Sequence, residues 1–323
     1  MEILIYSHLM VNRFEYTRCS LCPNECLVDR TAGQLGVCKQ TDKVKIAWSG
    51  LHRGEEPPVT GENGSGMIFF SGCPLHCQYC QNRQISGSDG ENYGIEISIQ
   101  ELSELMLDLE RMGAATLNLV TGTHFIPSIV EALDIAGSKG FSLPVVWNSS
   151  GYENIHGLGL IDDYIDIYLL DCKTLSPGTA SRFCGRARYA DYIVPVLDFV
   201  KMKHPKTDLD NMKGTILRHL VFPGEIRATR EFLKFYSTNY KDNFFLSLMV
   251  QFVPPKENPS LSAISDAEYD ELIDMLSELE IEDGFAQEKG EDDILWIPDF
   301  TRDIPFPKPF ADPSPYFLSL KHR

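Results

Sequence analysis

Short apolar runs alternate along this chain with longer segments in which apolar residues recur every three or four positions. The first run, residues 67–71, lies between Gly66 and Gly72 and is typical of a buried strand. Ser98 can then cap a helix, because apolar residues follow it at helical spacing as far as Met112. The same alternation predicts further strands over 115–121, 143–147, 165–170, 216–222 and 244–251, and helices over 125–138, 189–202, 225–236 and 267–279.

Repeated alternation of strands and helices favours parallel strands joined by right-handed crossovers. Six such units predict an α/β fold, a partial (β/α)6 barrel over residues 67–290, with its chemistry at the carboxyl ends of the strands. Residues 1–66 are rich in Gly, Pro and cysteine without a sustained apolar period, so we expect an irregular N-terminal segment. Residues 291–323, rich in Pro and aromatics, are expected to wrap over the body as a tail.

The composition narrows the class of protein. With 43% hydrophobic and 23% charged residues, a chain of 323 residues can bury one large core, as ordinary soluble enzymes do. The formal net charge of −17 repels phosphate backbones, so nucleic-acid binding is not expected. The sequence shows neither the pattern of a signal peptide nor that of a membrane span. We therefore expect a cytoplasmic protein that does not bind membranes.

Nine cysteines in a reducing cytosol are more often metal ligands than disulfides. Three of them lie in the loop GCPLHCQYC, residues 72–80, directly after the first predicted strand. Thiolates at Cys-x3-Cys-x2-Cys spacing can hold three corners of a [4Fe–4S] cluster and leave one iron open to a ligand. The sequence therefore predicts such a cluster on Cys73, Cys77 and Cys80.

A structural zinc site is the alternative for this loop. It would need a distant fourth ligand, or His76 within the loop. Zinc knuckles usually pair two Cys-x2-Cys halves, which this loop does not, so the spacing favours the cluster. Cys172 and Cys184 stand apart from both cysteine groups and are expected to be small buried residues.

The loop and its surroundings resemble a known family. An aromatic residue before the last cysteine, here Tyr79, completes the signature of radical S-adenosylmethionine (SAM) enzymes. The resemblance extends from about Cys19 to Arg302 and points to the PflX-like branch of the pyruvate formate-lyase activating enzyme group. The segments that carry it are FFSGCPLHCQYCQNRQIS, LNLVTGTHF, WNSSGYE, DIYLLDCK, LRHLVFPG and WIPDFTRD.

The resemblance implies a cofactor pair. In such enzymes SAM chelates the open iron, the reduced cluster cleaves the sulfonium bond, and the resulting 5′-deoxyadenosyl radical takes a hydrogen atom from the substrate. Asp171 and Lys173 resemble the pair that contacts SAM in the activating enzymes. They lie two positions apart at the end of a predicted strand and therefore on one side of it. A surface ion pair is the alternative for these two residues.

Other strand ends supply further candidates for the SAM pocket. Asn148 and Ser149 loosely match a Thr-Asn-Gly turn of the family and could bind SAM or a small cation, or form an ordinary turn. The Gly-Gly-Glu turn that binds the SAM amino group in many relatives is absent, and Thr121 or a neighbouring group must replace it. His124 is expected either beside Thr121 at the SAM pocket or as a cap of the following helix. His219 is either an adenine or ribose contact or a hydrogen-bonded core histidine.

A second group of cysteines lies in the N-terminal segment: Cys19, Cys22, Cys26 and Cys38. Four thiols complete a tetrahedral site, so we predict a closed metal site that is structural or carries electrons. Zinc and a second [4Fe–4S] cluster are both consistent with the spacing. This group precedes the three-cysteine loop, whereas the ferredoxin-like insert of many glycyl-radical activases follows it.

Three functions remain open at this point. The resemblance implies an activase that takes a hydrogen atom from a glycine of a partner glycyl radical enzyme, with flavodoxin or ferredoxin as the electron donor. A radical SAM enzyme acting on a small molecule or on a protein side chain is the second. The third is an iron–sulfur or zinc protein that only transfers electrons or scaffolds a complex, and it predicts no cleavage of SAM.

Overall fold

Six parallel strands form the centre of one mixed sheet in the computed structural model, which describes residues 14–87, 91–253, 264–290 and 297–323. They are adjacent in the order β2, β4, β5, β6, β7 and β8, and the short parallel strand β9 follows at the edge. Their bounds are Ser65–Phe70, Leu117–Val120, Val145–Ser149, Ile167–Asp171, Gly214–Leu220, Phe245–Met249 and, for β9, Gly284–Ala286. This confirms the predicted α/β fold and its six strand–helix units.

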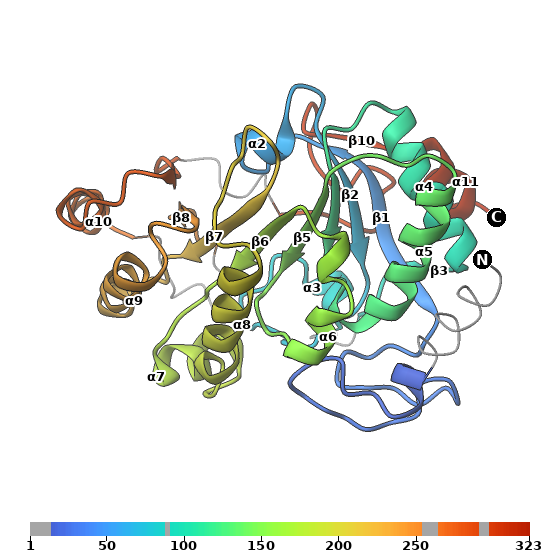
Figure 1. The fold of residues 1–323 in the computed structure, drawn as a ribbon, viewed down its shortest axis with the longest axis horizontal. Coiled ribbons are helices and arrows are strands. Elements are labelled where there is room, and N and C mark those ends of the chain that lie inside the picture. Colours follow the sequence, from blue (N-terminus) through green and yellow to red (C-terminus); the bar gives the residue numbers. More distant parts are fainter. Residues whose placement is uncertain (1–13, 88–90, 254–263, 291–296) are drawn as a thin grey trace.

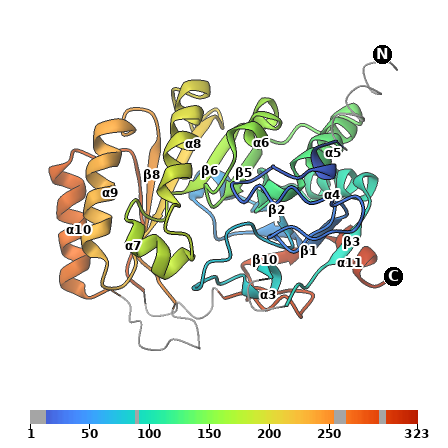
Figure 2. The same cartoon turned by 90° about the horizontal axis from the view of Figure 1, so that it is seen from below.

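Helices connect these strands close to where the periodicity predicts them. Ser98 caps the first of them through a capping box, in which its side chain accepts from the N–H of Glu101 and the Glu101 carboxylate accepts from Ser98. Pro195 lies inside a later helix. The main helices are α4 (Ile99–Arg111), α5 (Ile126–Ser138), α8 (Ala190–Lys203), α9 (Ile226–Asn239) and α10 (Asp266–Glu278). Figure 2 shows α9 and α10 at one end of the sheet and α4 at the other.

The N-terminal segment is not irregular throughout, which corrects the prediction for residues 1–66. Val44–His52 forms the longest strand, β1, which pairs antiparallel with β2. β3 (Ile95–Ile97) and β10 (Ala311–Pro313) also pair with β1. The tail therefore adds a strand to the sheet, and helix α11 (Pro315–Lys321) follows it against α4. Residues 1–13 and 291–296, parts of the predicted segment and tail, lie outside the described residues.

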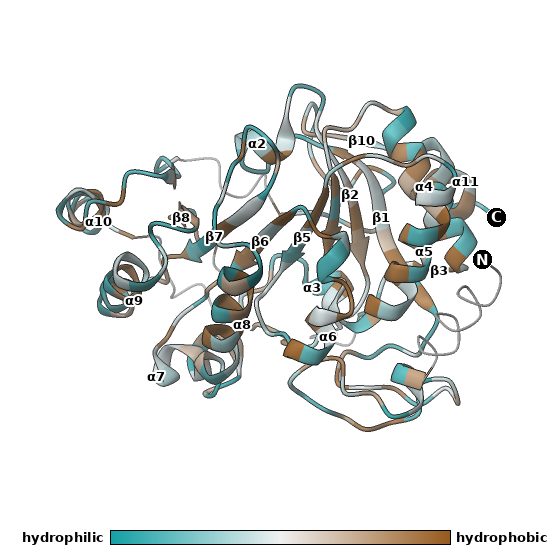
Figure 3. Cartoon of the chain, viewed as in Figure 1, coloured by the Kyte–Doolittle hydropathy of each residue, from teal (hydrophilic) through white to brown (hydrophobic). Residues whose placement is uncertain are grey.

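The barrel is open, because the strand order runs from β10 to β9 without these two edges pairing in the described residues. Its interior is filled at the amino ends of the strands by an apolar cluster of Val59, Val146, Ile167, Leu169 and Ile216. Val59 belongs to α2 (Pro57–Thr60), a single turn in the β1–β2 connection. In Figure 3 the central strands β2 and β6 are coloured as hydrophobic. The apolar cluster leaves only the carboxyl-end half of the interior for a ligand.

No helix among the described residues combines the length and the apolar character that crossing a membrane requires.

Candidate functional site

A cavity of about 380 Å³ lies at the carboxyl ends of the parallel strands. The predicted loop of residues 72–80 forms one wall, and the ends of β4 to β8 form the others. Most of the residues predicted for the cofactor pair are brought together here, although they are up to 100 positions apart in the chain: Cys73, Cys77, Tyr79, Cys80, Thr121, Asn148, Asp171 and Lys173 all line this cavity.

Of the three cysteines of the loop, Cys77 is buried and Cys73 and Cys80 are partly buried. Burial raises the pKa of Cys73 and Cys80, to about 12 for Cys80. Contact with the Cys184 thiol and then burial raise the pKa of Cys77, while the Lys173 ammonium acts in the opposite direction on all three. A cation next to the three thiols favours their ionised, metal-binding form.

Asp171 and Lys173 form a direct pair. The Lys173 Nζ donates a hydrogen bond of 2.8 Å to the Asp171 Oδ2. The side chain of Lys173 is only 12% exposed and that of Asp171 23%, so they are not the surface ion pair considered as the alternative. Burial alone would lower the pKa of Lys173, but the Asp171 carboxylate, Tyr79 and Cys77 raise it well above its ordinary value. The ammonium is therefore charged and close to the cysteine loop.

Aromatic rings surround Tyr79. Its ring lies 4.9 Å from that of Phe222 and 5.8 Å from that of Phe252, and the Lys173 Nζ stands 5.6 Å from its centroid. The Tyr79 hydroxyl is buried and has no hydrogen-bond partner among the described residues. An orphaned hydroxyl at the wall of a cavity can accept or donate a hydrogen bond once a ligand is bound.

Thr121 has a left-handed backbone conformation with φ of 59°. This conformation is costly for a β-branched residue and is found mainly where the surrounding structure imposes it, often at functional sites. The backbone N–H of Thr121 donates to the Asn148 carbonyl at 2.9 Å, which holds the ends of β4 and β5 together. Thr121, the expected substitute for the missing Gly-Gly-Glu turn, therefore lies at the cavity in a constrained backbone conformation.

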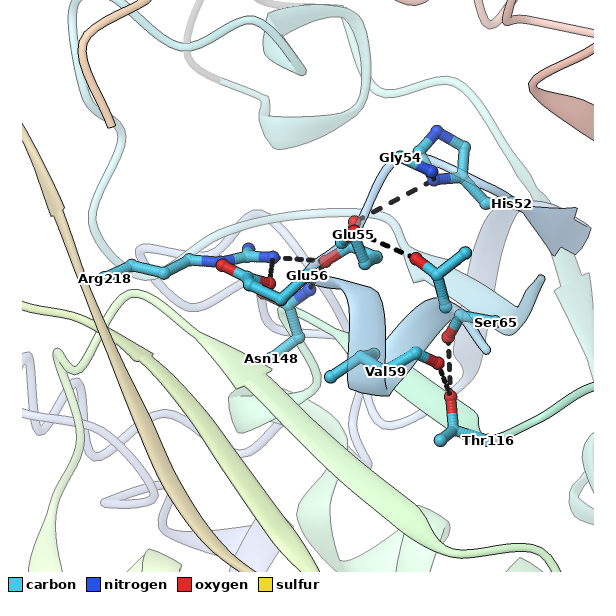
Figure 4. Close-up of polar contacts among 10 residues, drawn as sticks. His52, Gly54, Glu55, Glu56, Val59, Ser65, Thr116, Asn148 and Arg218 are labelled. Carbon is cyan, nitrogen blue, oxygen red and sulfur yellow. Dashed lines mark hydrogen bonds and ion pairs between the residues drawn. The ribbon is translucent and has the colours of Figure 1, made fainter. Parts of the chain in front are cut away.

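Glu55, Asn148 and Arg218 line the cavity and, together with Glu56, form a network of polar contacts that we call its charged floor (Figure 4). Arg218 of β7 donates from Nε and Nη2 to both carboxylate oxygens of Glu56, at 2.7 and 2.6 Å, and from Nη2 to Glu55. The Asn148 amide also donates to Glu55, at 3.4 Å. All three charged side chains are at most 14% exposed. Two carboxylates share one guanidinium, so the floor has an excess of negative charge.

Sequence reasoning did not find this floor. Glu55 and Glu56 belong to the β1–β2 connection, which was predicted to be irregular, and Arg218 is the residue of β7 that pairs in register with Asp171 of β6. His52, the last residue of β1, also lines the cavity, and its Nδ1 accepts from the N–H of Gly54. The strand register could have indicated Arg218, because a residue beside Asp171 on the neighbouring strand faces the same side of the sheet.

His219 does not line this cavity, so its assignment as an adenine or ribose contact is wrong. Its Nδ1 lies 2.7 Å from the Cys172 carbonyl and its Nε2 3.1 Å from the Thr229 hydroxyl, and its ring stacks on Phe232. Because side chains alternate along a strand, Arg218 faces the cavity and His219 faces α9. His219 is instead a hydrogen-bonded core histidine, which was the other interpretation of the sequence.

His124 does not cap the helix that follows it. It lies in a short 3-10 helix (Thr123–Phe125) and is buried, with its Nε2 2.8 Å from the carbonyl oxygen of Ser71. Cys172 and Cys184 are both fully buried, as predicted. Cys184 also contacts Cys77, which spacing along the chain did not indicate.

The four N-terminal cysteines lie in a segment without strands, and three of them are buried. Figure 1 shows this segment, in dark blue, at the lower edge of the barrel. In the part of the chain that the structure describes, no three His, Cys, Asp or Glu side chains surround a single point as ligands of one metal ion would. This holds for both cysteine groups.

Comparison with known proteins finds a matching family model and a relative. The model of the Radical SAM superfamily matches residues 67–236, about half of the chain. An uncharacterized protein of Methanocaldococcus jannaschii, MJ0674, is 28% identical over 255 residues, which cover 76% of this chain and 70% of that protein.

A solved structure with low sequence identity has a similar fold. A radical SAM methyltransferase from Sphaerobacter thermophilus matches 72% of this chain and 68% of its own, with a TM-score of 0.50 and 11% identity. SuiB of Streptococcus suis bound to its precursor peptide SuiA has a TM-score of 0.46 and 12% identity over 67% of this chain. This chain matches less than half of SuiB, namely 46% of it.

Proposed function

Because this chain belongs to the radical SAM superfamily, we propose that it binds a [4Fe–4S] cluster on Cys73, Cys77 and Cys80 and cleaves SAM reductively. The observation that carries the proposal is the arrangement of the cavity. Three thiols on one wall face strand ends that present a buried acid–ammonium pair, Asp171 and Lys173. An electron carrier has no need of a three-thiol site beside a cavity. The reducing cytoplasm is the compartment that suits these free thiols.

The residues present fit the two cofactors. The three thiols beside the Lys173 ammonium suit an anionic cluster, and the backbone N–H of Leu75 donates to the Cys73 sulfur at 3.4 Å. The orphaned Tyr79 hydroxyl supplies a further polar group at this wall. When bound, the cluster and SAM supply a carbon-centred radical that removes a hydrogen atom from a substrate.

The remaining polar groups of the cavity hold and orient SAM in this proposal. Lys173 offers a cation for the SAM carboxylate, and Asp171, which accepts a hydrogen bond from Lys173, offers carboxylate oxygens to donor groups of SAM. Asn148 is fixed by its bond to Glu55, which leaves its amide oxygen for a donor group of the ligand. The constrained turn at Thr121 presents backbone oxygens at the place where many relatives bind the SAM amino group.

As the substrate we propose a glycine of a partner glycyl radical enzyme, with flavodoxin or ferredoxin as the electron donor. The support for this step is the resemblance of six segments of the chain to pyruvate formate-lyase activating enzymes. Modification of a small molecule or of a protein side chain is the second candidate, since superfamily members with this fold act on different substrates.

Reductive cleavage of SAM tests the central proposal. Anaerobically reconstituted protein is mixed with dithionite and SAM, and 5′-deoxyadenosine is quantified beside a Cys77→Ala variant and a Cys172→Ala control. We expect product from the wild type and the control and none from Cys77→Ala. Absence of product from a wild type with a fully loaded cluster would reject the proposal. A glycyl-radical signal in electron paramagnetic resonance, formed on a co-purified partner, would decide the substrate.

A further inference from the structure

The two cysteine groups lie directly against each other, although about 50 residues separate them in the chain. Asn24, between Cys22 and Cys26, donates a hydrogen bond of 2.7 Å to the carbonyl of Pro74, next to Cys73. His76, next to Cys77, lies with its Nε2 2.7 Å from the carbonyl of Val37, which precedes Cys38. Each contact joins a residue beside an N-terminal cysteine to a residue beside a cysteine of the 72–80 loop.

The sulfur atoms of the N-terminal group receive hydrogen bonds from N–H groups. The backbone N–H of Val37 donates to the Cys26 Sγ at 3.2 Å, and the Asn24 amide lies 3.6 Å from the Cys22 Sγ. The Nη1 of Arg30 lies 3.6 Å from the Cys19 Sγ. Donors directed at sulfur would stabilise the negative charge that a metal-bound thiolate carries.

Gly36 leaves room between two of these sulfurs. A Cβ atom at this position would lie 3.4 Å from the Cys38 Sγ and 3.6 Å from the Cys26 Sγ. Cys26 and Cys38 therefore flank one small space that any side chain at position 36 would enter.

Arg30 provides the strongest indication of negative charge. Its side chain is 0% exposed, yet no Asp or Glu forms an ion pair with it anywhere in the described part of the chain. Its guanidinium donates to the carbonyls of Thr41 and His124 and to Cys19. A buried cation without a carboxylate needs another anion beside it, and metal-bound thiolates supply one.

We propose that Cys19, Cys22, Cys26 and Cys38 hold a second [4Fe–4S] cluster, which passes electrons to the cluster of the 72–80 loop. Four thiolates give this second cluster a net negative charge, which Arg30 balances in part. A cubane distributes its thiolates over four iron atoms, so they need not surround a single point. The contacts with Pro74 and His76 place it beside a redox site, where an electron carrier is useful and a structural zinc ion is not.

The electron balance is simple, and the relay part rests on the proposed SAM chemistry. A low-potential one-electron donor protein of the flavodoxin or ferredoxin class loses one electron. The N-terminal cluster would accept this electron and pass it to the cluster of the 72–80 loop. The N-terminal cluster would thereby return to its starting oxidation state. One electron breaks one carbon–sulfur bond of SAM, giving methionine and the radical. The Val37 carbonyl and the His76 ring form a connection of one hydrogen bond between the two loops.

The metal content of the anaerobically reconstituted full chain tests the site without reference to activity. We expect about eight irons per chain in the wild type and in Cys172→Ser, and about four in Cys26→Ser and in Cys38→Ser. Four irons and one zinc per wild-type chain would overturn the proposal, as would four irons without a further metal. Mössbauer and electron paramagnetic resonance spectra of the wild type decide the same point if the variants do not fold.

Reduction kinetics test the relay. Photoreduced flavodoxin and dithionite are compared as reductants of the cluster on residues 72–80 in Cys26→Ser and in Cys172→Ser. We expect Cys26→Ser to retain reduction by dithionite and to lose at least about tenfold in rate with flavodoxin. Equal rates with flavodoxin would overturn the relay. Failure of SAM cleavage in a chain with about eight irons would reject the proposed function and leave the second cluster intact.

Discussion

The carbonyl oxygen of Cys38 lies 2.5 Å from the position that a Cβ atom on Gly72 would occupy. Gly72 has a φ of 86° and stands immediately before Cys73. The residue in front of the three-cysteine loop must therefore be a glycine, both for its conformation and because the N-terminal segment packs against it. The two cysteine groups depend on each other for their positions.

Gly72→Ala is expected to destabilise the protein more than a glycine replacement in open space. Gly140 is the matched control, because it has a φ of 94° and no atom within 4 Å of its Cβ position. Gly140→Ala should cost about 1 kcal/mol through backbone conformation alone, and Gly72→Ala should cost more because the backbone of Cys38 must move. Urea unfolding of both variants measures the difference. Equal costs would show that the contact with Cys38 does not constrain the loop.

Arg218→Met is expected to lower the free energy of unfolding by about 3–5 kcal/mol, because it leaves the carboxylates of Glu55 and Glu56 buried without a cation. The control is Arg227→Met, whose side chain is 88% exposed and pairs with Glu231 on the surface of α9. That change should alter stability by less than about 0.5 kcal/mol. Chemical denaturation at pH 7 distinguishes the two. A similar small effect for both would mean that the floor of the cavity is hydrated.

Lys173→Met is expected to weaken SAM binding by about tenfold or more, since it removes a charged hydrogen-bond donor from the cavity. The iron content should remain that of the wild type, because Lys173 is not a ligand in the proposed site. Isothermal titration calorimetry with SAM under anaerobic conditions measures the affinity. Lys43→Met, at a side chain that is 69% exposed on the surface, serves as the control. Unchanged affinity in Lys173→Met would remove this residue from the proposed SAM contacts.

The decrease in the free energy of unfolding at acid pH should depend on His219. Burial lowers the pKa of His219 to about 4 in the folded protein, whereas a histidine in the unfolded chain has its ordinary pKa of 6.5. Between these values the unfolded state binds the additional proton, so the free energy of unfolding decreases as the pH falls from 6.5 towards 4. His219→Gln keeps a polar side chain that cannot titrate, and we expect it to flatten this part of the profile. Denaturant midpoints across the pH range provide the measurement, and an unchanged slope would contradict the assignment.

Local pattern was sufficient for most of the secondary structure and for one cysteine group. Apolar periodicity and the Ser98 cap depend on residues a few positions apart, so they are readable from the chain, and α4 begins where the pattern predicts. The spacing of Cys73, Cys77 and Cys80 is equally local. The position of Asp171 and Asn148 at the same edge of the sheet followed from the rule that parallel strands bring their carboxyl ends together.

Only the tertiary structure decided what depends on distant pairing. β1 was missed because its apolar character becomes useful only when it pairs with β2, β3 and β10. The salt bridge between Glu55 and Arg218 joins residues 163 positions apart, and no local signal links them. His219 was misplaced because alternation shows that neighbours face opposite sides, but not which side holds the cavity.

The sequence by itself therefore determined the order of elements and the open barrel of parallel strands, and it predicted the ligand set of the three-cysteine loop. The tertiary structure decided which polar residues share the cavity and that the N-terminal cysteines lie against the loop. The physical reason is that strand and helix patterns and ligand spacing arise from short-range geometry. Burial, charge pairing and the contact of Gly72 with Cys38 arise from packing between segments that the chain keeps far apart.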